Sequence, residues 1–236
     1  MKEIIMITGA SSGMGREFAM QIEKKYQVDE IWVIARRKER LESLKERLQT
    51  KVRIFALDLT QKESFEIIQE ALFQEKPRVK ALINCSGYGK LDHYENMSIG
   101  VIENMMNLNM LAVVKMVNSV LPYMHKKSSI VNLASCSGYM PIPYLNIYAS
   151  TKAFVLSYSR ALNEELKYRQ IHVLAICPYW VETEFFDRAV VKDKKPVVIR
   201  YGKVYKAKDV IKKAIKDMES SKDVSLYGTI NRIQIL

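Results

Sequence analysis

Short apolar runs alternate along the chain with longer stretches in which apolar residues recur at helical spacing. Each run holds about five aliphatic or β-branched residues, which is typical of strands that are covered on both faces. These runs predict strands at Glu3–Ile7, Ile31–Ala35, Val52–Leu57, Ala81–Asn84, Ile130–Ala134 and His172–Ile176. The stretches between them predict helices over about 13–25, 38–49, 61–75, 98–125 and 147–169.

This alternation predicts right-handed βαβ crossovers and a parallel sheet. No linker rich in Pro, Gly or Ser divides the chain, so residues 1–236 are expected to form a single domain. Ligands of such sheets bind beyond the carboxyl ends of the strands, where candidate site residues are therefore sought. Residues 178–206 have no steady period and are expected to form a substrate loop, either as a lid or as a short helix pair packed on the core.

The composition fits a globular chain with one sizeable core. Of the 236 residues, 48% are hydrophobic and 27% are charged, which argues against disorder, collagen and a disulfide scaffold. Three scattered cysteines, an odd number, indicate reduced thiols in a cytoplasmic protein. The N-terminal apolar run is too short for a secretion signal, and no stretch approaches the ~20 apolar residues of a membrane span.

The net charge of +11 is compatible with nucleic acid, an anionic membrane or an anionic small molecule as partner. The basic residues are dispersed among acidic ones, which favours a solvated basic surface and no nucleic-acid partner. No metal site is predicted, because the chain has no Cys-x-x-Cys pair and its histidines, at 93, 125 and 172, are scattered. His172 lies in a predicted strand and is expected to be packed.

A glycine-rich turn, Thr8–Gly15, separates the first predicted strand from the first predicted helix. Gly9 permits a tight turn, Gly13 a close approach of the backbone, and Gly15 close packing of the helix. Backbone N–H groups at the helix N-terminus would then face the pyrophosphate of a dinucleotide. The turn residues predicted to bind it are Gly9, Ser11, Ser12, Gly13, Met14 and Gly15.

Arg36 and Arg37 follow the second predicted strand, where an enzyme that prefers NAD typically places Asp or Glu. The two arginines favour NADP(H) over NAD(H), because a 2′-phosphate accepts forked hydrogen bonds from arginine and offsets cations at a helix N-terminus. The alternative is that both point into water. After the third predicted strand, Asp58, with Leu59 beside it, could bind the adenine amino group or could cap the next helix.

Tyr148 and Lys152 lie one turn apart on one face of the helix predicted over 147–169. A free phenol titrates near about 10, and a nearby ammonium lowers that pKa, which is the tuning that general acid–base catalysis requires. Such a pair is common on helices by chance. It gains weight from Ser135, just past a predicted strand, and from Asn109 in the preceding helical stretch.

Two further segments complete a set of motifs: Asn84–Gly87 after the fourth predicted strand and Pro178–Thr183 after the sixth. With Thr8–Gly15 and the tetrad Asn109, Ser135, Tyr148 and Lys152, they resemble the short-chain dehydrogenase/reductase family from residue 1 to about 185. Cys85 and Ser86 depart from the family's Asn-Asn-Ala-Gly element, and Tyr179 replaces the glycine of its Pro-Gly-x-Val-x-Thr element.

The resemblance implies a Rossmann-type α/β fold, a doubly wound parallel sheet of about seven strands with helices on both faces. It also implies hydride transfer between a ketone and a secondary alcohol. Tyr148 would protonate the carbonyl oxygen, Lys152 would lower the Tyr148 pKa and hold the nicotinamide ribose, and Ser135 would hydrogen-bond the substrate oxygen. Asn109 would anchor a water that links Lys152 to solvent. The other implied cofactor contacts are Asn84, Ser86 and Gly87 along the cofactor, and Pro178, Val181 and Thr183 at the nicotinamide carboxamide.

The segment Gly138–Tyr144, with its Pro-x-Pro arrangement, resembles the branch of the family that holds hydroxysteroid and lipid-ketone reductases. An apolar, aromatic substrate pocket is therefore expected, and about half of the tyrosines near it are expected to miss it. The predicted substrate-binding residues are Ser135, Tyr144, Tyr148, Tyr179 and Phe185, with Tyr88 and Tyr94 as further candidates.

The predicted function is that of an NADP(H)-dependent oxidoreductase that interconverts a ketone and a secondary alcohol on a lipophilic substrate. The alternative is a catalytically weak regulatory or scaffold protein that binds the cofactor on the same fold. Family members usually assemble through the helices at about 98–125 and 147–169, which implies a homodimer or homotetramer. The apolar segment Ile230–Leu236 could be a sheet-edge segment, a subunit contact or an interfacial anchor.

Overall fold

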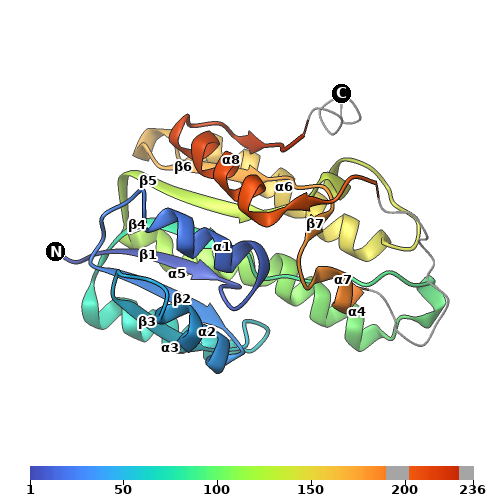
Figure 1. Cartoon of the computed structure of the whole chain (residues 1–236), viewed down its shortest axis with the longest axis horizontal. Coiled ribbons are helices and arrows are strands. Elements are labelled where there is room, and N and C mark those ends of the chain that lie inside the picture. The colour runs from blue at the N-terminus through green and yellow to red at the C-terminus, as the bar shows by residue number, and fades with distance from the viewer. Residues whose placement is uncertain (190–201, 229–236) are drawn as a thin grey trace.

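A parallel sheet forms the centre of the molecule. The structure is a computed structural model that describes residues 1–189 and 202–228. Within these ranges, seven strands pair in the order β3-β2-β1-β4-β5-β6-β9, and every pair is parallel (Figure 1). The strands are β1 (Glu3–Thr8), β2 (Glu30–Ala35), β3 (Val52–Ala56), β4 (Arg78–Asn84), β5 (Met124–Leu133), β6 (His172–Ile176) and β9 (Val224–Ser225). The doubly wound sheet is therefore confirmed.

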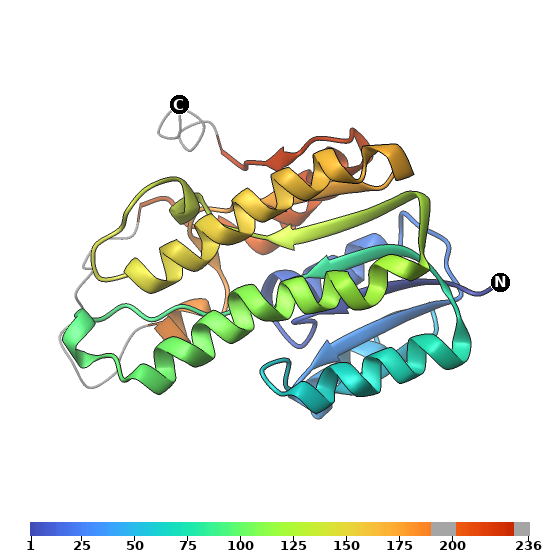
Figure 2. The same cartoon turned by 180° about the vertical axis from the view of Figure 1, so that it is seen from behind.

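Helices cover both faces of this sheet, as Figures 1 and 2 show from opposite sides. One face carries α1 (Gly13–Ile22), α2 (Lys38–Lys45) and α8 (Ala207–Glu219), and the other carries α3 (Lys62–Glu75), α5 (Ala112–Val120) and α6 (Asn146–Glu165). Successive strand residues alternate between the two cores: Ile5 and Ile7 pack towards α1, whereas Ile4 and Met6 pack towards α3 and α5. Burial on both faces explains why the strands are continuous apolar runs.

The stretch 98–125, predicted as one helix, is interrupted. It begins as α4 (Ile99–Met106), passes through a π-helical turn at Asn107–Leu111, and continues as α5. The spacing of apolar residues does not reveal such a turn, because the helix direction is kept. Turns of this kind are frequent at functional sites, and this one contains Asn109.

Three features near the strand ends and the C-terminus differ from the prediction. β5 begins at Met124, six residues before the predicted Ile130, because the buried Met124 is followed by three polar, exposed residues, His125, Lys126 and Lys127, that interrupt the apolar signal. The chain then contributes α8 and β9, for which no element was predicted. β9 has two residues, too few to form a pattern.

The described residues of the segment 178–206 include a two-stranded sheet that is separate from the central one. β7 (Val181–Glu182) pairs in parallel with β8 (Tyr205–Lys206), and α7 (Phe185–Ala189) follows β7. Residues 190–201 and the apolar segment Ile230–Leu236 lie outside the described residues, so the predictions made for them stay predictions. None of the helices within 1–189 and 202–228 combines the length and the hydropathy that a transmembrane span requires.

Candidate active site

A cleft opens where the carboxyl ends of the central strands meet, at the point where the chain winds from β1 to β3 on one side and from β4 to β6 on the other. Most of the predicted site residues line it. They are Gly9, Ser11, Ser12, Gly13, Met14, Gly15, Arg36, Arg37, Asp58, Leu59, Ser86, Gly87, Ser135, Tyr148, Lys152, Pro178, Tyr179, Val181, Thr183 and Phe185. The predicted residues Asn84, Asn109 and Tyr144 are not part of this lining.

The glycine turn forms one wall, and its glycines have no room for side chains. A Cβ at Gly9 would lie 2.7 Å from the Cys85 backbone, and a Cβ at Gly15 would lie 2.4 Å from the Gly9 carbonyl oxygen. Gly9 and Gly13 also have φ values of +69° and +51°, in the region that favours glycine. The turn therefore keeps backbone against the cleft and delivers the N-terminus of α1 to it, where N–H groups are free to bind an anion.

Asn84 lies behind the cleft wall, not on it. It pairs in register with Asn132 of the neighbouring strand β5, and its Nδ2 donates to Asn132 Oδ1 at 2.9 Å. Both side chains are buried. The expected contact between Asn84 and the adenosine is thus corrected: facing amides hold β4 and β5 together there.

Arg36 and Asp58 face each other at the outer end of the cleft, with Arg36 Nη1 3.5 Å from Asp58 Oδ2. Asp58 Oδ1 accepts hydrogen bonds from the N–H (2.9 Å) and the hydroxyl (2.8 Å) of Thr60. Burial by itself would raise the pKa of Asp58, but the Thr60 hydrogen bonds and the charge of Arg36 lower it. Asp58 thus makes a turn contact with Thr60 and does not cap α3, whose N-cap is Gln61 with no side-chain cap hydrogen bond. The adenine contact stays a prediction.

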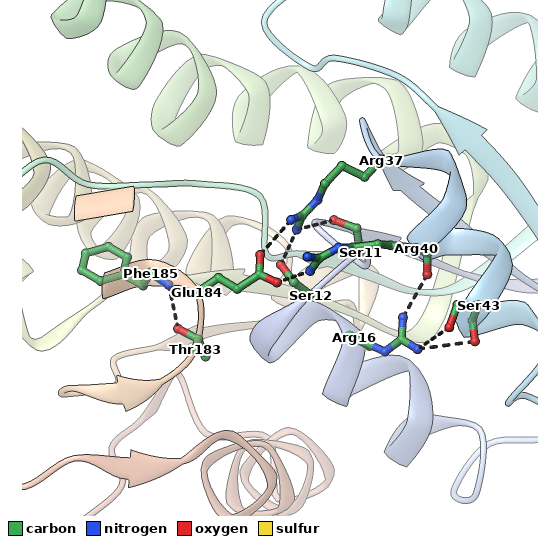
Figure 3. Close-up of polar contacts among 9 residues, drawn as sticks. All are labelled: Ser11, Ser12, Arg16, Arg37, Arg40, Ser43, Thr183, Glu184 and Phe185. Atoms are coloured by element: carbon green, nitrogen blue, oxygen red, sulfur yellow. Dashed lines mark hydrogen bonds and ion pairs between the residues drawn. The ribbon is translucent and has the colours of Figure 1, made fainter. Parts of the chain in front are cut away.

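Arg37 crosses the cleft to an acidic residue that the sequence did not single out. Its Nη1 donates to Glu184 Oε2 at 2.8 Å, and its Nη2 donates to the hydroxyls of Ser12 (2.8 Å) and Ser11 (3.2 Å) (Figure 3). Arg40, in the first turn of α2, binds the other carboxylate oxygen of Glu184. Burial would raise the pKa of Glu184, but hydrogen bonds from both arginines lower it. Sequence spacing gives no sign of a pair 147 residues apart.

The opposite end of the cleft holds the Tyr148 and Lys152 pair on α6. Lys152 Nζ donates to the Leu133 carbonyl at the end of β5 at 2.6 Å, and it lies 5.6 Å from the centre of the Tyr148 ring. Ser135 follows β5 by two residues, and its Oγ accepts a hydrogen bond from the Ser137 N–H at 3.1 Å. The side chains of Ser135, Tyr148 and Lys152 thus converge in one place, as predicted from their order.

Burial controls the ionisation of this pair. Burial raises the pKa of Tyr148, and a hydrogen bond with Ser135 offsets only part of that effect. Burial also lowers the pKa of Lys152 to about 8, against the effect of Cys85. In this arrangement the Lys152 ammonium reaches back to Leu133 and the phenol is desolvated, so the lowering of the Tyr148 pKa by Lys152 stays a prediction.

Asn109 supports the cleft from behind. In the π-helical turn its Nδ2 donates to the Tyr88 carbonyl (2.9 Å) and to Thr151 Oγ1 (3.0 Å), and its Oδ1 accepts from the Tyr88 N–H (3.1 Å). A Cβ at Gly87 would lie 3.0 Å from Asn109 Oδ1 and 3.5 Å from Lys152 Nζ. Asn109 and Lys152 therefore approach the same glycine, and the absence of a side chain at Gly87 leaves room for both.

An aromatic contact closes the substrate side of the cleft. The rings of Phe185 and Tyr148 lie 5.3 Å apart, centre to centre. Gly89 lies against both: a Cβ there would come within 2.9 Å of Phe185 Cζ and 3.0 Å of Tyr148 Cδ2. Sequence reasoning missed Gly89, although its place just beyond the Asn84–Gly87 motif was a usable signal.

The tyrosines divide as expected, with some in the cleft and others outside it. Tyr88 and Tyr179 line the cleft. Tyr144, a predicted substrate residue, is 42% exposed and packs edge-on against the His93 ring, and Tyr94 is 62% exposed. The prediction that Tyr144 lines the substrate pocket is therefore corrected, because its side chain lies outside the cleft lining. The backbone of Tyr144 is left-handed, with φ of +63°.

The two ends of the cleft fit one elongated ligand. The glycine turn, the α1 N-terminus and the nearby arginines suit the phosphates of a dinucleotide, and the far end offers hydroxyl groups and an ammonium. Thr183 lies between them, and its side chain is 3.2 Å from where a Gly13 Cβ would be. Within residues 1–189 and 202–228, no three His, Cys, Asp or Glu side chains come close enough together to hold a metal ion.

Comparison with known proteins agrees with this geometry. The family model described as short chain dehydrogenase matches residues 3–194. The chain belongs to the short-chain dehydrogenase family.

The curated relatives include reductases of long acyl chains. The very-long-chain 3-oxoacyl-CoA reductase of Macaca fascicularis is 31% identical over 206 residues, which cover 83% of this chain and 63% of that protein. The protein of the same name from Mus musculus is 30% identical over 247 residues, covering 98% and 75%. The chain thus spans less than two thirds of the length of the first of these relatives.

A solved structure of the family also matches nearly the whole chain. The short-chain dehydrogenase from Sphingobium yanoikuyae in complex with NADPH is 26% identical with a TM-score of 0.84, covering 98% of this chain and 91% of that one. The closed form of serine dehydrogenase complexed with NADP+ is 25% identical with a TM-score of 0.83, covering 94% and 93%. These matches extend the likeness beyond the sequence motifs to the fold as a whole.

Proposed function

We propose that this protein is an NADP(H)-dependent oxidoreductase that interconverts a ketone and a secondary alcohol on a lipophilic substrate. The observation that carries the proposal is the convergence of Ser135, Tyr148 and Lys152 at one end of a cleft whose other end combines a glycine turn with arginines. When bound, a nicotinamide dinucleotide supplies or accepts the hydride. The chain's own residues then hold the substrate oxygen and move its proton.

Tyr148 is the proposed acid and base. In the direction of reduction its hydroxyl gives a proton to the carbonyl oxygen as that oxygen gains charge, and in the reverse direction the phenolate takes the proton back. Burial raises the pKa of Tyr148, so the phenol is protonated at neutral pH but is a weaker acid than an exposed phenol, and the hydrogen bond with Ser135 acts in the opposite direction. The Ser135 hydroxyl, which meets the phenol, is the proposed second donor to the same oxygen.

Lys152 and Asn109 are proposed to serve this proton transfer. With a pKa of about 8, Lys152 holds a proton at neutral pH and releases one more readily than an exposed lysine does. Its Nζ and Asn109 Oδ1 both approach residue 87, the place where a water or a ribose hydroxyl could join them. Asn109 further fixes the backbone of Tyr88 through two hydrogen bonds, which positions that wall of the cleft.

NADP(H) is proposed as the cofactor because of the charge around the adenosine end. Four arginines gather there: Arg36, Arg37, Arg40 and Arg188. All but Arg40 line the cleft. Burial lowers the pKa of Arg188, and repulsion from the other three arginines lowers it further. Such a cluster favours a ligand with an additional phosphate. Two relatives of this fold were solved with NADPH and NADP+.

A lipophilic substrate is proposed from the walls at the catalytic end. Ile142, Leu145, Trp180 and Phe185 line the cleft near Tyr148. Aliphatic and aromatic walls with few polar groups suit an acyl chain or a bulky ketone. The long-chain specificity named for the curated relatives points in the same direction.

The test is a turnover assay of the purified chain with both cofactors and a panel of ketones. The panel contains a long-chain 3-oxoacyl thioester, a steroid ketone, a diaryl ketone and a small sugar ketone, and the readout is oxidation of NADPH or NADH at 340 nm. We expect NADPH-dependent reduction of at least one lipophilic ketone and no comparable rate with the sugar. Binding of NADPH without turnover of any ketone would instead favour a cofactor-binding regulatory or scaffold protein.

A further inference from the structure

Glu184 occupies the arginine groups that a 2′-phosphate would need. Arg37 uses one nitrogen for Glu184 and the other for the hydroxyls of Ser11 and Ser12, and Arg40 binds the second oxygen of the same carboxylate (Figure 3). A carboxylate bound by two guanidinium groups makes the contacts that a phosphate makes.

We propose that Glu184 is a built-in competitor of the cofactor's 2′-phosphate, and that it sets the preference between NADP(H) and NAD(H). This inference rests on the proposed function, because it requires a dinucleotide in this cleft. NADP(H) must displace the carboxylate from Arg37 and Arg40. NAD(H), which lacks the 2′-phosphate, can bind with the bridge in place.

The surrounding charges allow such an exchange. Glu184 and Arg37 have side chains about one third exposed, so the pair is neither locked in the core nor fully solvated. Arg188 lies near the same carboxylate and adds a further positive charge, and Arg36 is partly neutralised by Asp58. A phosphate brings more negative charge than the one carboxylate that it replaces, so the arginine cluster favours the exchange.

The position of Glu184 in the chain gives the competition a wider effect. Thr183, immediately before it, is the proposed anchor of the nicotinamide carboxamide. Phe185, immediately after it, packs on the Tyr148 ring, and its N–H donates to Thr183 Oγ1 at 3.3 Å. Glu184, which binds the arginines at the adenosine end, therefore lies in the chain between Thr183 and Phe185, two residues of the catalytic end.

The experiment measures binding of two small probes by calorimetry: adenosine 2′,5′-bisphosphate and adenosine 5′-monophosphate, which differ only in the 2′-phosphate. The variant is Glu184→Gln, which keeps the shape and removes the charge. Glu182→Gln is the matched control, because it makes the same change at an exposed residue two positions earlier on β7. Glu184→Ala serves as a second variant, and circular dichroism checks that each protein is folded.

We expect Glu184→Gln and Glu184→Ala to bind the bisphosphate about tenfold more tightly than the unchanged protein. Arg37 and Arg40 then no longer have to be released from the carboxylate before they bind the 2′-phosphate. Their affinity for the monophosphate should stay within about twofold, and Glu182→Gln should match the unchanged protein. An unchanged affinity for the bisphosphate overturns the inference. A weaker affinity also overturns it, since Glu184 would then close over the bound cofactor.

Arg37→Ala separates this inference from the proposed function. If Arg37→Ala weakens bisphosphate binding while Glu184→Gln has no effect, the NADP(H) preference stands and the competitor role fails. If Arg37→Ala leaves bisphosphate binding unchanged, the assigned 2′-phosphate site is wrong, and both the cofactor preference and the competitor role fall.

Discussion

The two ends of the cleft balance charge in different ways. At the phosphate end, Arg37 and Arg40 share Glu184, and Arg36 faces Asp58, so opposite charges compensate one another across distant segments. At the catalytic end, Lys152 is 3% exposed and donates to a backbone carbonyl, and burial lowers its pKa to about 8. The first end is suited to exchanging one anion for another, and the second is suited to giving up a proton.

The largest expected effect is at the catalytic end. Tyr148→Phe removes the proposed proton donor while keeping the ring that packs on Phe185. We expect kcat for the best ketone of the panel to fall by about 10³-fold, because a positioned acid contributes ~10²–10⁴-fold. Steady-state kinetics with NADPH provides the measurement.

Tyr144→Phe is the matched control for this change. It makes the same substitution four residues earlier, on a side chain that lies outside the cleft lining and contacts His93. Its kcat should equal that of the unchanged protein. If Tyr148→Phe kept full turnover, the acid would have to be another group, and proton transfer could not be assigned to Tyr148 at this end of the cleft.

The second effect is on stability and depends on pH. Lys152→Met replaces a buried ammonium by an apolar chain of similar length, and it leaves the Leu133 carbonyl without its donor. We expect the variant to be more stable at pH 7 by about 2 kcal/mol, since the removed penalty exceeds the lost hydrogen bond. It should also lose turnover, because the Lys152 ammonium that lowers the stability is the group proposed to serve proton transfer.

The sign of the pH dependence follows from the lowered pKa. Between about pH 8 and the ordinary lysine pKa of 10.5, the folded protein holds fewer protons than the unfolded chain, so its stability rises with pH. The advantage of Lys152→Met should therefore shrink as the pH rises from 8 to 10. Urea unfolding at several pH values measures it, with the exposed Lys212→Met as control. An advantage that does not change with pH would mean that Lys152 is not a buried cation.

The sequence predicted the framework of the site well, because short-range rules define it. Gly9, Gly13 and Gly15 have the conformations and close contacts that their spacing implies. The periodicity of the helix 147–169 placed Tyr148 and Lys152 on one face, and the structure brings both to the cleft. Strands buried on both faces appeared as apolar runs for the same local reason.

What the sequence could not predict depends on contacts between distant segments. The pairing of Arg37 with Glu184 joins the N-cap of α2 to the loop after β7, and charge alone does not say which acid meets which base. Likewise, the register of β4 and β5 turns Asn84 towards Asn132. The spacing of Tyr148 and Lys152 on a helix also says nothing of how deeply the pair is buried, and burial raises the pKa of Tyr148.

The smallest effect concerns the contact of Gly89 with Phe185 and Tyr148 at the catalytic end. Its backbone is not in the left-handed region, so alanine is allowed there, but the added Cβ would press on Phe185 and on Tyr148. We expect Gly89→Ala to lower kcat about fivefold with little change in KM for NADPH, because the acid is displaced and the phosphate end is untouched. Gly100→Ala, where nothing lies within 4 Å, should leave kcat unchanged and slightly stabilise α4.

A double variant decides whether this loss comes from the ring contact. Phe185→Leu removes the aromatic edge that a Cβ at Gly89 would meet at 2.9 Å. If positioning of Tyr148 is the cause, Gly89→Ala combined with Phe185→Leu should recover part of the lost kcat, and the two changes should not be additive. Additive losses would instead mean that Gly89 matters only for local folding, and that the aromatic contact does not position the acid.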